Sequence, residues 1–231
     1  MQNLREKTAN LEVFSGIRVR SPIVVRLDGR GFRKVLENSK KPYDLEFAEK
    51  LALATDSLFK ESGFSPILAF IFSDEVNLLF MEVPFSGRIE KIDSVIASFI
   101  SAALALALGR IISMDCRILS ICEDEVAGYL AKRQDETWIN HVFSYGFYAL
   151  VNEGKTHRQA MELLRGMKEH EIHELVFQKG VNLAKTASWE RRGVLIYREY
   201  GEVIHNWDLP LFRSEDGLRF LKGIIENHKK C

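Results

Sequence analysis

The sequence has few cysteines and no excess of charge of either sign. Its three cysteines are an odd number and lack the paired spacing of a metal-binding motif: Cys116, Cys122 and Cys231. We expect reduced thiols in an intracellular, cytoplasmic protein, because disulfides form mainly in oxidising compartments. Lysine plus arginine and aspartate plus glutamate number 32 each, so a protein coated in positive charge is excluded. A local basic surface could still bind nucleic acid.

Targeting and membrane-spanning segments are also lacking. Residues 1–10 are polar, so no secretory signal is expected. The longest apolar run, residues 95–108, is about 14 residues long, whereas a bilayer needs about 20. It is therefore predicted to form a buried helix, and no membrane partner is expected. No Walker loop, G-x-S-x-G motif, dinucleotide fingerprint or internal repeat occurs.

What is present is the pattern of an α+β protein with an ordinary globular composition. Apolar runs predict four strands, and helical periodicity predicts two helices between them, in the order strand, helix, strand, strand, helix, strand. This is the ferredoxin-like βαββαβ pattern, in which the strands are arranged 4-1-3-2. The strands are predicted at 22–28, 67–72, 76–82 and 116–122, and the helices at 44–60 and 93–108.

The second half of the chain is predicted to be mostly helical. Residues 1–122 form the predicted core, and residues 123–231 complete the same compact unit. Its predicted elements are helices at 123–152, 156–167, 168–179 and 214–229, and a terminal hairpin at 193–206 with Gly201 in its turn.

Two acidic segments are expected to meet at one edge of this sheet. Asp28 ends the first strand beside Gly29, and Asp74 lies between the second and third strands. Either segment alone is also typical of a tight turn. Together they favour a metal site, because converging carboxylates repel each other unless a cation neutralises them, and paired carboxylates hold the metal ions of phosphoryl transfer.

Basic and aromatic residues near these acids suit a nucleotide and an RNA. Arginines and lysines follow the first acid, and Arg88 and Lys91 follow the third strand on one predicted helical face. Solvated loops are the alternative interpretation of each. Trp138 and Trp189 could stack on bases or pack in the core.

In this arrangement the sequence resembles the tRNA(His) guanylyltransferase family, and within it the archaeal and bacterial branch that repairs tRNA 5′ ends. The resemblance covers about residues 20–200. It rests on a series of segments in the family's order: VRLDGRGF at 25–32, KPYD at 41–44, SDE at 73–75, Asp115 to Arg117, YLAKRQDETWIN at 129–140, HELVFQKGVN at 173–182 and WERRGVLIYRE at 189–199.

The resemblance implies a polymerase palm-like catalytic core that adds nucleotides to the 5′ end of tRNA in the 3′–5′ direction. It implies two Mg²⁺ ions, ATP or GTP for activating the 5′ phosphate, GTP or other nucleoside triphosphates for addition, and a homotetramer. Asp28, Asp74 and Glu75 would be catalytic, with Asp28, Asp74 and the Gly29 carbonyl as metal ligands. The implied nucleotide contacts are Arg26, Gly29, Arg30, Gly31, Phe32, Arg33, Lys41, Ser73, Asp74, Arg88 and Lys91. The implied RNA contacts are Arg117, Lys132, Arg133, Arg191 and Arg192.

The sequence departs from the family pattern at two places. Arg33 replaces a family histidine, which changes one implied triphosphate contact. Residues 138–141 read Trp-Ile-Asn-His where eukaryotic members have His-Ile-Asn-Asn, a region those members use in selecting tRNA(His). This second departure and the closer likeness of residues 173–199 to the bacterial and archaeal branch favour template-dependent repair over strict selection of tRNA(His) for addition of G(−1). Two rival functions remain open from the sequence. One is a palm-type nucleotide cyclase, and the other is a non-catalytic RNA-binding protein.

Overall fold

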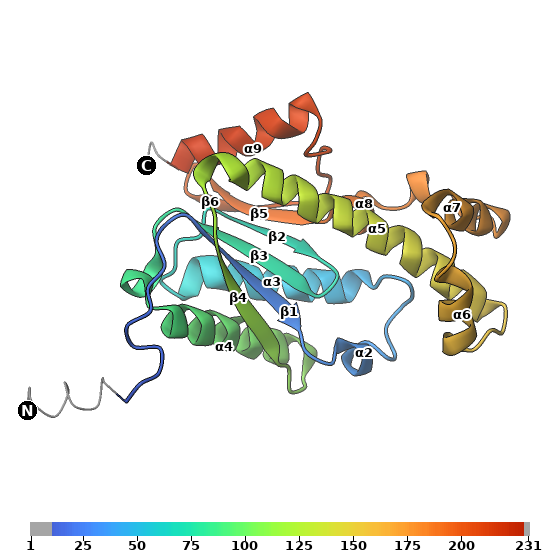
Figure 1. Ribbon diagram of the computed structural model, residues 1–231, viewed down its shortest axis with the longest axis horizontal. Helices are drawn as coiled ribbons and strands as arrows, with labels where there is room; N and C mark the ends of the chain where they lie inside the picture. Colours follow the sequence, from blue (N-terminus) through green and yellow to red (C-terminus); the bar gives the residue numbers. More distant parts are fainter. Residues whose placement is uncertain (1–10, 229–231) are drawn as a thin grey trace, which may run out of the picture.

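The computed structural model describes residues 11–228 and contains a six-stranded antiparallel sheet with helices on both faces (Figure 1). The strand order is β4-β1-β3-β2-β5-β6. The strands are β1 (Ile23–Gly29), β2 (Leu68–Phe72), β3 (Glu75–Phe80), β4 (Met114–Ser120), β5 (Val194–Glu199) and β6 (Glu202–Asn206). The polar start at 1–10 and Cys231 lie outside the described residues.

The predicted α+β class and the ferredoxin-like core are confirmed. The first four strands are arranged 4-1-3-2, and each lies within two residues of its predicted range. β1 pairs antiparallel with both β3 and β4, and its partners Leu79 and Leu119 lie on either side of Val24. The apolar runs were reliable guides to β1, β2 and β3 because these three strands are buried on both faces along much of their length.

Helices α3 (Leu45–Glu61) and α4 (Ile89–Leu108) cover one face, and α5 (Val126–Asn152) and α9 (Glu215–His228) cover the other (Figure 1). Successive strand residues alternate between the faces. Val25 and Leu27 therefore pack under α3 and α4, whereas Val24 belongs to the layer beneath α5. By the same alternation Asp28 lies on the face of α5.

Helix α4 is longer than the sequence predicted. It begins at Ile89 rather than at residue 93, so its 20 residues are long and apolar enough to cross a membrane. The length of α4 therefore does not distinguish a membrane-spanning helix from a core helix, but its packing against the sheet does. Ile92, Ile96, Ile100 and Leu104 recur every four residues and are fully buried against the sheet.

The second half of the chain contributes both a helical extension and two strands. Helices α6 (His157–Leu164) and α7 (Glu169–Gln178) pack against the far end of α5, beyond the sheet (Figure 1). The hairpin β5–β6 extends the sheet at the free edge of β2, where Ile71 pairs with Val194. The short helices α2 (Phe32–Val35) and α8 (Ser188–Arg192) were not predicted, because four or five residues show no helical period.

Candidate active site

The two predicted acids lie together at one end of the sheet. Leu27 of β1 pairs with Val76 of β3, which places the end of β1 beside the β2–β3 turn that carries Asp74. The Asp74 carboxylate lies against the backbone of Gly29, since a Cβ placed on Gly29 would be 2.6 Å from Asp74 Oδ2. Burial and the charge of nearby Asp28 raise the pKa of Asp74 to about 6.

Gly29 is required at this position because a larger residue has no room. Its Cβ would also lie 2.3 Å from the ring of Phe32, which is buried and packs edge-on against Phe47. Phe32 thus fills the core with its side chain, so only its backbone could contact a nucleotide. Ser73 has a positive φ of 52° and donates its hydroxyl to Asp74 Oδ1 at 3.2 Å. The turn is therefore closed around the Asp74 carboxylate.

The acid pair suits a hard, hydrated cation such as Mg²⁺. Among the described residues, neither Asp28 nor Asp74 forms an ion pair with a protein cation. Within the same part of the chain, no three His, Cys, Asp or Glu side chains gather as a metal cluster. A cation here would have two carboxylates and the Gly29 carbonyl, with phosphate oxygens and water as its other ligands, as is usual for Mg²⁺.

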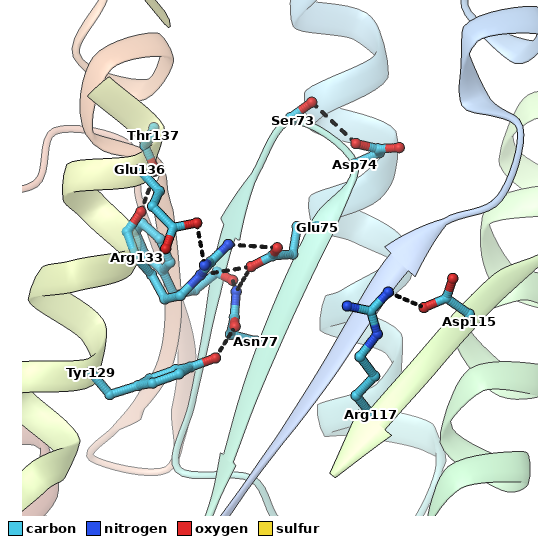
Figure 2. Close-up of polar contacts among 11 residues, drawn as sticks. Ser73, Asp74, Glu75, Asn77, Asp115, Arg117, Tyr129, Arg133, Glu136 and Thr137 are labelled. Atoms are coloured by element: carbon cyan, nitrogen blue, oxygen red, sulfur yellow. Dashed lines mark hydrogen bonds and ion pairs between the residues drawn. The ribbon is translucent and has the colours of Figure 1, made fainter. Parts of the chain in front are cut away.

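Glu75 does not join the acid pair in this structure, and its catalytic role stays a prediction. Figure 2 shows its side chain directed towards α5, away from Asp74. Arg133 donates from Nε to Oε1 at 3.0 Å and from Nη2 to Oε2 at 2.6 Å, and Asn77 donates to Oε1 at 2.7 Å. Arg133 is only 7% exposed and its guanidinium stacks over Phe72. Its predicted role in RNA binding is therefore wrong, because it is used inside the protein.

A small cavity of about 100 Å³ opens beside Ser73, between α3 and α5. Tyr43 and Trp189 meet edge to face across it at 6.0 Å, and Tyr43 also stacks on the buried His141. Burial raises the pKa of the Tyr43 phenol. Neither Tyr43 nor His141 was predicted as a site residue, although Tyr43 belongs to KPYD at 41–44 and His141 to the Trp-Ile-Asn-His segment at 138–141. Polar groups from Asp44, Thr137, Asn140, Ser144 and Glu190 complete the lining.

Two family models together match nearly all of the chain. The model for tRNAHis guanylyltransferase matches residues 5–127, and the model for the Thg1 C terminal domain matches residues 124–219. The chain belongs to the tRNA(His) guanylyltransferase family. The two matches meet close to the end of the predicted core.

Individual relatives agree with this family assignment. The chain is 30% identical to tRNA(His) guanylyltransferase of Neurospora crassa, over 77% of the chain and 67% of the relative. It is 27% identical to tRNA(His) guanylyltransferase 1 of Arabidopsis thaliana, over 84% of the chain but only 37% of that longer relative. It is also 27% identical to the probable enzyme of Drosophila melanogaster, over 88% and 77%.

Solved structures share the fold. A bacterial tRNA(His) guanylyltransferase-like protein in complex with ATP superposes with a TM-score of 0.81 over 97% of this chain and 99% of that chain, at 22% identity. The tRNA(His) guanylyltransferase of Saccharomyces cerevisiae gives a TM-score of 0.71 over 81% and 91%, also at 22% identity.

Two of the nucleotide contacts implied by the family likeness are not at the acid pair. β3 leads away from Asp74 over about 17 Å, and Arg88 and Lys91 follow it at the start of α4. Arg88 instead pairs with Glu90 and forms a β-bridge with Arg18. A single chain therefore does not bring Arg88 or Lys91 to Asp74, and their contact with a nucleotide stays a prediction.

Other implied nucleotide contacts lie in the loop between β1 and α3, on the side of α5 and α6. Arg33 donates from Nη2 to Nδ1 of His157 at 3.1 Å. Lys41 donates to the Leu36 carbonyl and lies over the ring of Tyr148 at 5.8 Å. Arg30 is exposed, and Gly31 has a φ of 72° at the start of α2. This loop therefore carries three of the implied cations, and Arg30 directly follows Gly29.

The remaining implied contacts fall into two groups. Arg26 and Arg117 lie opposite each other on β1 and β4, on the same face as Asp28, and Arg117 pairs with Asp115 at 3.5 Å. Lys132 is exposed on α5. Arg191 and Arg192 on α8 border, with Trp138, an open hollow of about 470 Å³. Their guanidinium groups donate to the carbonyls of residues 186 and 209.

Proposed function

We propose that this chain is a nucleotidyltransferase that adds nucleotides to the 5′ end of a tRNA in the 3′–5′ direction, after ATP or GTP activates the 5′ phosphate. Membership of the tRNA(His) guanylyltransferase family supports the reaction class. The observation that carries the proposal is the Asp74 carboxylate beside Asp28, partly buried, with a raised pKa and without a protein cation among the described residues.

Asp28, Asp74 and the Gly29 carbonyl are proposed to hold two Mg²⁺ ions. When bound, the metal would neutralise the two acids and stabilise the charge that develops on the attacking and leaving oxygens. The protein's own groups bind and orient the nucleotide. Ser73 and the cations of the β1–α3 loop, Arg30, Arg33 and Lys41, would face its phosphates, and the cavity between Tyr43 and Trp189 would receive its base.

Template-dependent repair is proposed in preference to strict selection of tRNA(His). Trp138 replaces the first histidine of the eukaryotic motif, and its indole donates to Glu169 at 2.8 Å and stacks on His141. These contacts hold the side chain within the helical half. A cytoplasmic homotetramer that binds tRNA stays a prediction from the resemblance.

A 5′-end extension assay tests the proposal. The full chain is incubated with full-length and 5′-truncated tRNAs, Mg²⁺, ATP and each of the four nucleotides. We expect incorporation on the truncated tRNA of the nucleotide that pairs with the opposite strand, and its loss in Asp28→Asn and Asp74→Asn. A cyclic product from labelled ATP or GTP without RNA would indicate a cyclase instead. Tight tRNA binding without incorporation would indicate a non-catalytic RNA-binding protein.

A further inference from the structure

We infer that Arg133 is a positioning residue that holds the Glu75 carboxylate out of the acid site, so that a metal ion meets only Asp28 and Asp74. The inference rests on the proposed function, because it assigns the metal to that pair. The residues involved are Glu75 on β3 and Arg133 on α5, whose pairing could not be predicted from the sequence motifs.

The strand register alone would bring Glu75 to the metal site. Leu27 pairs with Val76 at the end of the β1–β3 ladder, and continuing that register by one residue would place Asp28 opposite Glu75. Directly opposed residues point to the same face, with their Cβ atoms about 5 Å apart. On its other side Asp28 pairs with Asp115 of β4. Asp28 is therefore flanked by an acid on each neighbouring strand, in addition to Asp74 in the turn.

Arginines engage both flanking acids. Arg133 donates two hydrogen bonds to the Glu75 carboxylate, and the side chains of Arg133 and Glu75 are 8% and 13% exposed. Arg117 pairs with Asp115 at 3.5 Å, in a contact that is 57% and 51% exposed. Figure 2 shows these two pairs on either side of β1, and Asp74 pointing away from both. The four acids are thus sorted into two that are neutralised by arginine and two that are free for a cation.

Further hydrogen bonds hold the Arg133–Glu75 ion pair in a fixed geometry. Asn77 donates to the same carboxylate and in turn accepts from the Tyr129 hydroxyl at 2.7 Å, while Glu136 binds the remaining edge of the guanidinium. Phe72 closes the other face of Arg133. Fully satisfied buried networks of this kind fix side-chain directions. Removing Arg133 would free Glu75 to turn towards Asp28.

Mn²⁺ alone, without nucleotide or tRNA, is the probe that tests this inference. Electron paramagnetic resonance measures free Mn²⁺ in a titration of the full-length parent and its variants. Arg133→Met is expected to bind Mn²⁺ roughly tenfold more tightly, because one more carboxylate can approach the divalent ion. The double variant Arg133→Met/Glu75→Gln should return to the parental affinity. Glu75→Gln alone should leave the affinity unchanged, and Arg158→Met, on the exposed surface of α6, serves as the control.

Two results would overturn the inference. One is a loss of Mn²⁺ affinity in Glu75→Gln as large as the loss in Asp74→Asn, which would make Glu75 a ligand. The other is an Arg133→Met variant that folds and binds Mn²⁺ as the parent does. If Arg133→Met shows no cooperative melting, the Glu75→Gln titration decides alone. Parental Mn²⁺ affinity in both Asp28→Asn and Asp74→Asn would instead refute the proposed metal site.

Discussion

Burial and a neighbouring carboxylate set the properties of Asp74, the residue on which the metal site depends. Its pKa of about 6 lies above the ordinary value of 3.8. A raised carboxylate pKa contributes stability below about 3.8, and that contribution is lost as the pH rises through about 6. At neutral pH the metal-free protein therefore carries a cost that a bound cation would relieve.

Asp74→Asn should consequently stabilise the metal-free protein at neutral pH. The gain over the parent should grow from pH 5 to pH 7.5, where the pKa difference corresponds to about 3 kcal/mol. Urea unfolding with a chelator present measures it at both values. Glu82→Gln, which removes an exposed acid, is the control. A gain that is the same at both pH values would show that Asp74 does not titrate as described.

Gly29 offers a second test at this scale. In Gly29→Ala the new methyl group would collide with the Phe32 ring and the Asp74 carboxylate. We expect a loss of about 1–3 kcal/mol in the free energy of unfolding and a loss of 5′-end extension. Gly128→Ala in α5 is the matched control, because nothing lies within 4 Å of its Cβ position. Full activity in Gly29→Ala would contradict the close approach of Asp74.

Single residues also show what could be predicted from the sequence and what could not. Asp28 and Asp74 could be paired because strand order alone brings their segments together. The partnership of Glu75 and Arg133 could not, because the sequence does not reveal which face of α5 meets the sheet. A basic pair such as Lys132 and Arg133 looks uniform in sequence, yet one is exposed and the other buried.

Among the elements, α4 has the composition of a membrane-spanning helix but packs against the sheet as a core helix. Its apolar residues surround the helix, but only one stripe is fully buried, while Leu106 is 86% exposed. The strands and long helices were predicted well because they extend over several periods. The predicted start of α4 at residue 93 was late, because Ile89 and Ile92 already belong to the helix.

Two substitutions in α4 separate the buried stripe from the exposed one. Ile96→Ala should lower the free energy of unfolding by about 2–5 kcal/mol, because it opens a cavity against the sheet. Leu106→Ala should change it by less than about 0.5 kcal/mol. Chemical denaturation of both variants measures the difference. Equal effects would mean that α4 is not anchored to the core by that face.

At the scale of the whole molecule, the two halves matched by separate family models share one sheet. β2 lies between β3 of the first half and β5 of the second, and α5 covers its outer face. The sequence predicted the hairpin but could not place it at the edge of β2, since the pairing joins residues more than 120 positions apart, Ile71 with Val194. We therefore propose that the two halves fold as one unit.

A chain that ends at residue 122 should fail to fold as a stable unit. It would expose the unpaired edge of β2 and the apolar face beneath α5, including the fully buried Phe70. We expect aggregation or a poorly dispersed amide spectrum by nuclear magnetic resonance. A monomeric fragment with a cooperative melting transition would show that the second half is dispensable for the fold.

The most direct test of the central claim is the position of a divalent ion in crystals of the protein grown with Mn²⁺ and a nucleoside triphosphate, located by anomalous scattering. We expect a peak bound by the carboxylates of Asp28 and Asp74 and the carbonyl of Gly29, with Glu75 still paired with Arg133. A peak bound by Glu75, or bound away from Asp28 and Asp74, would contradict it.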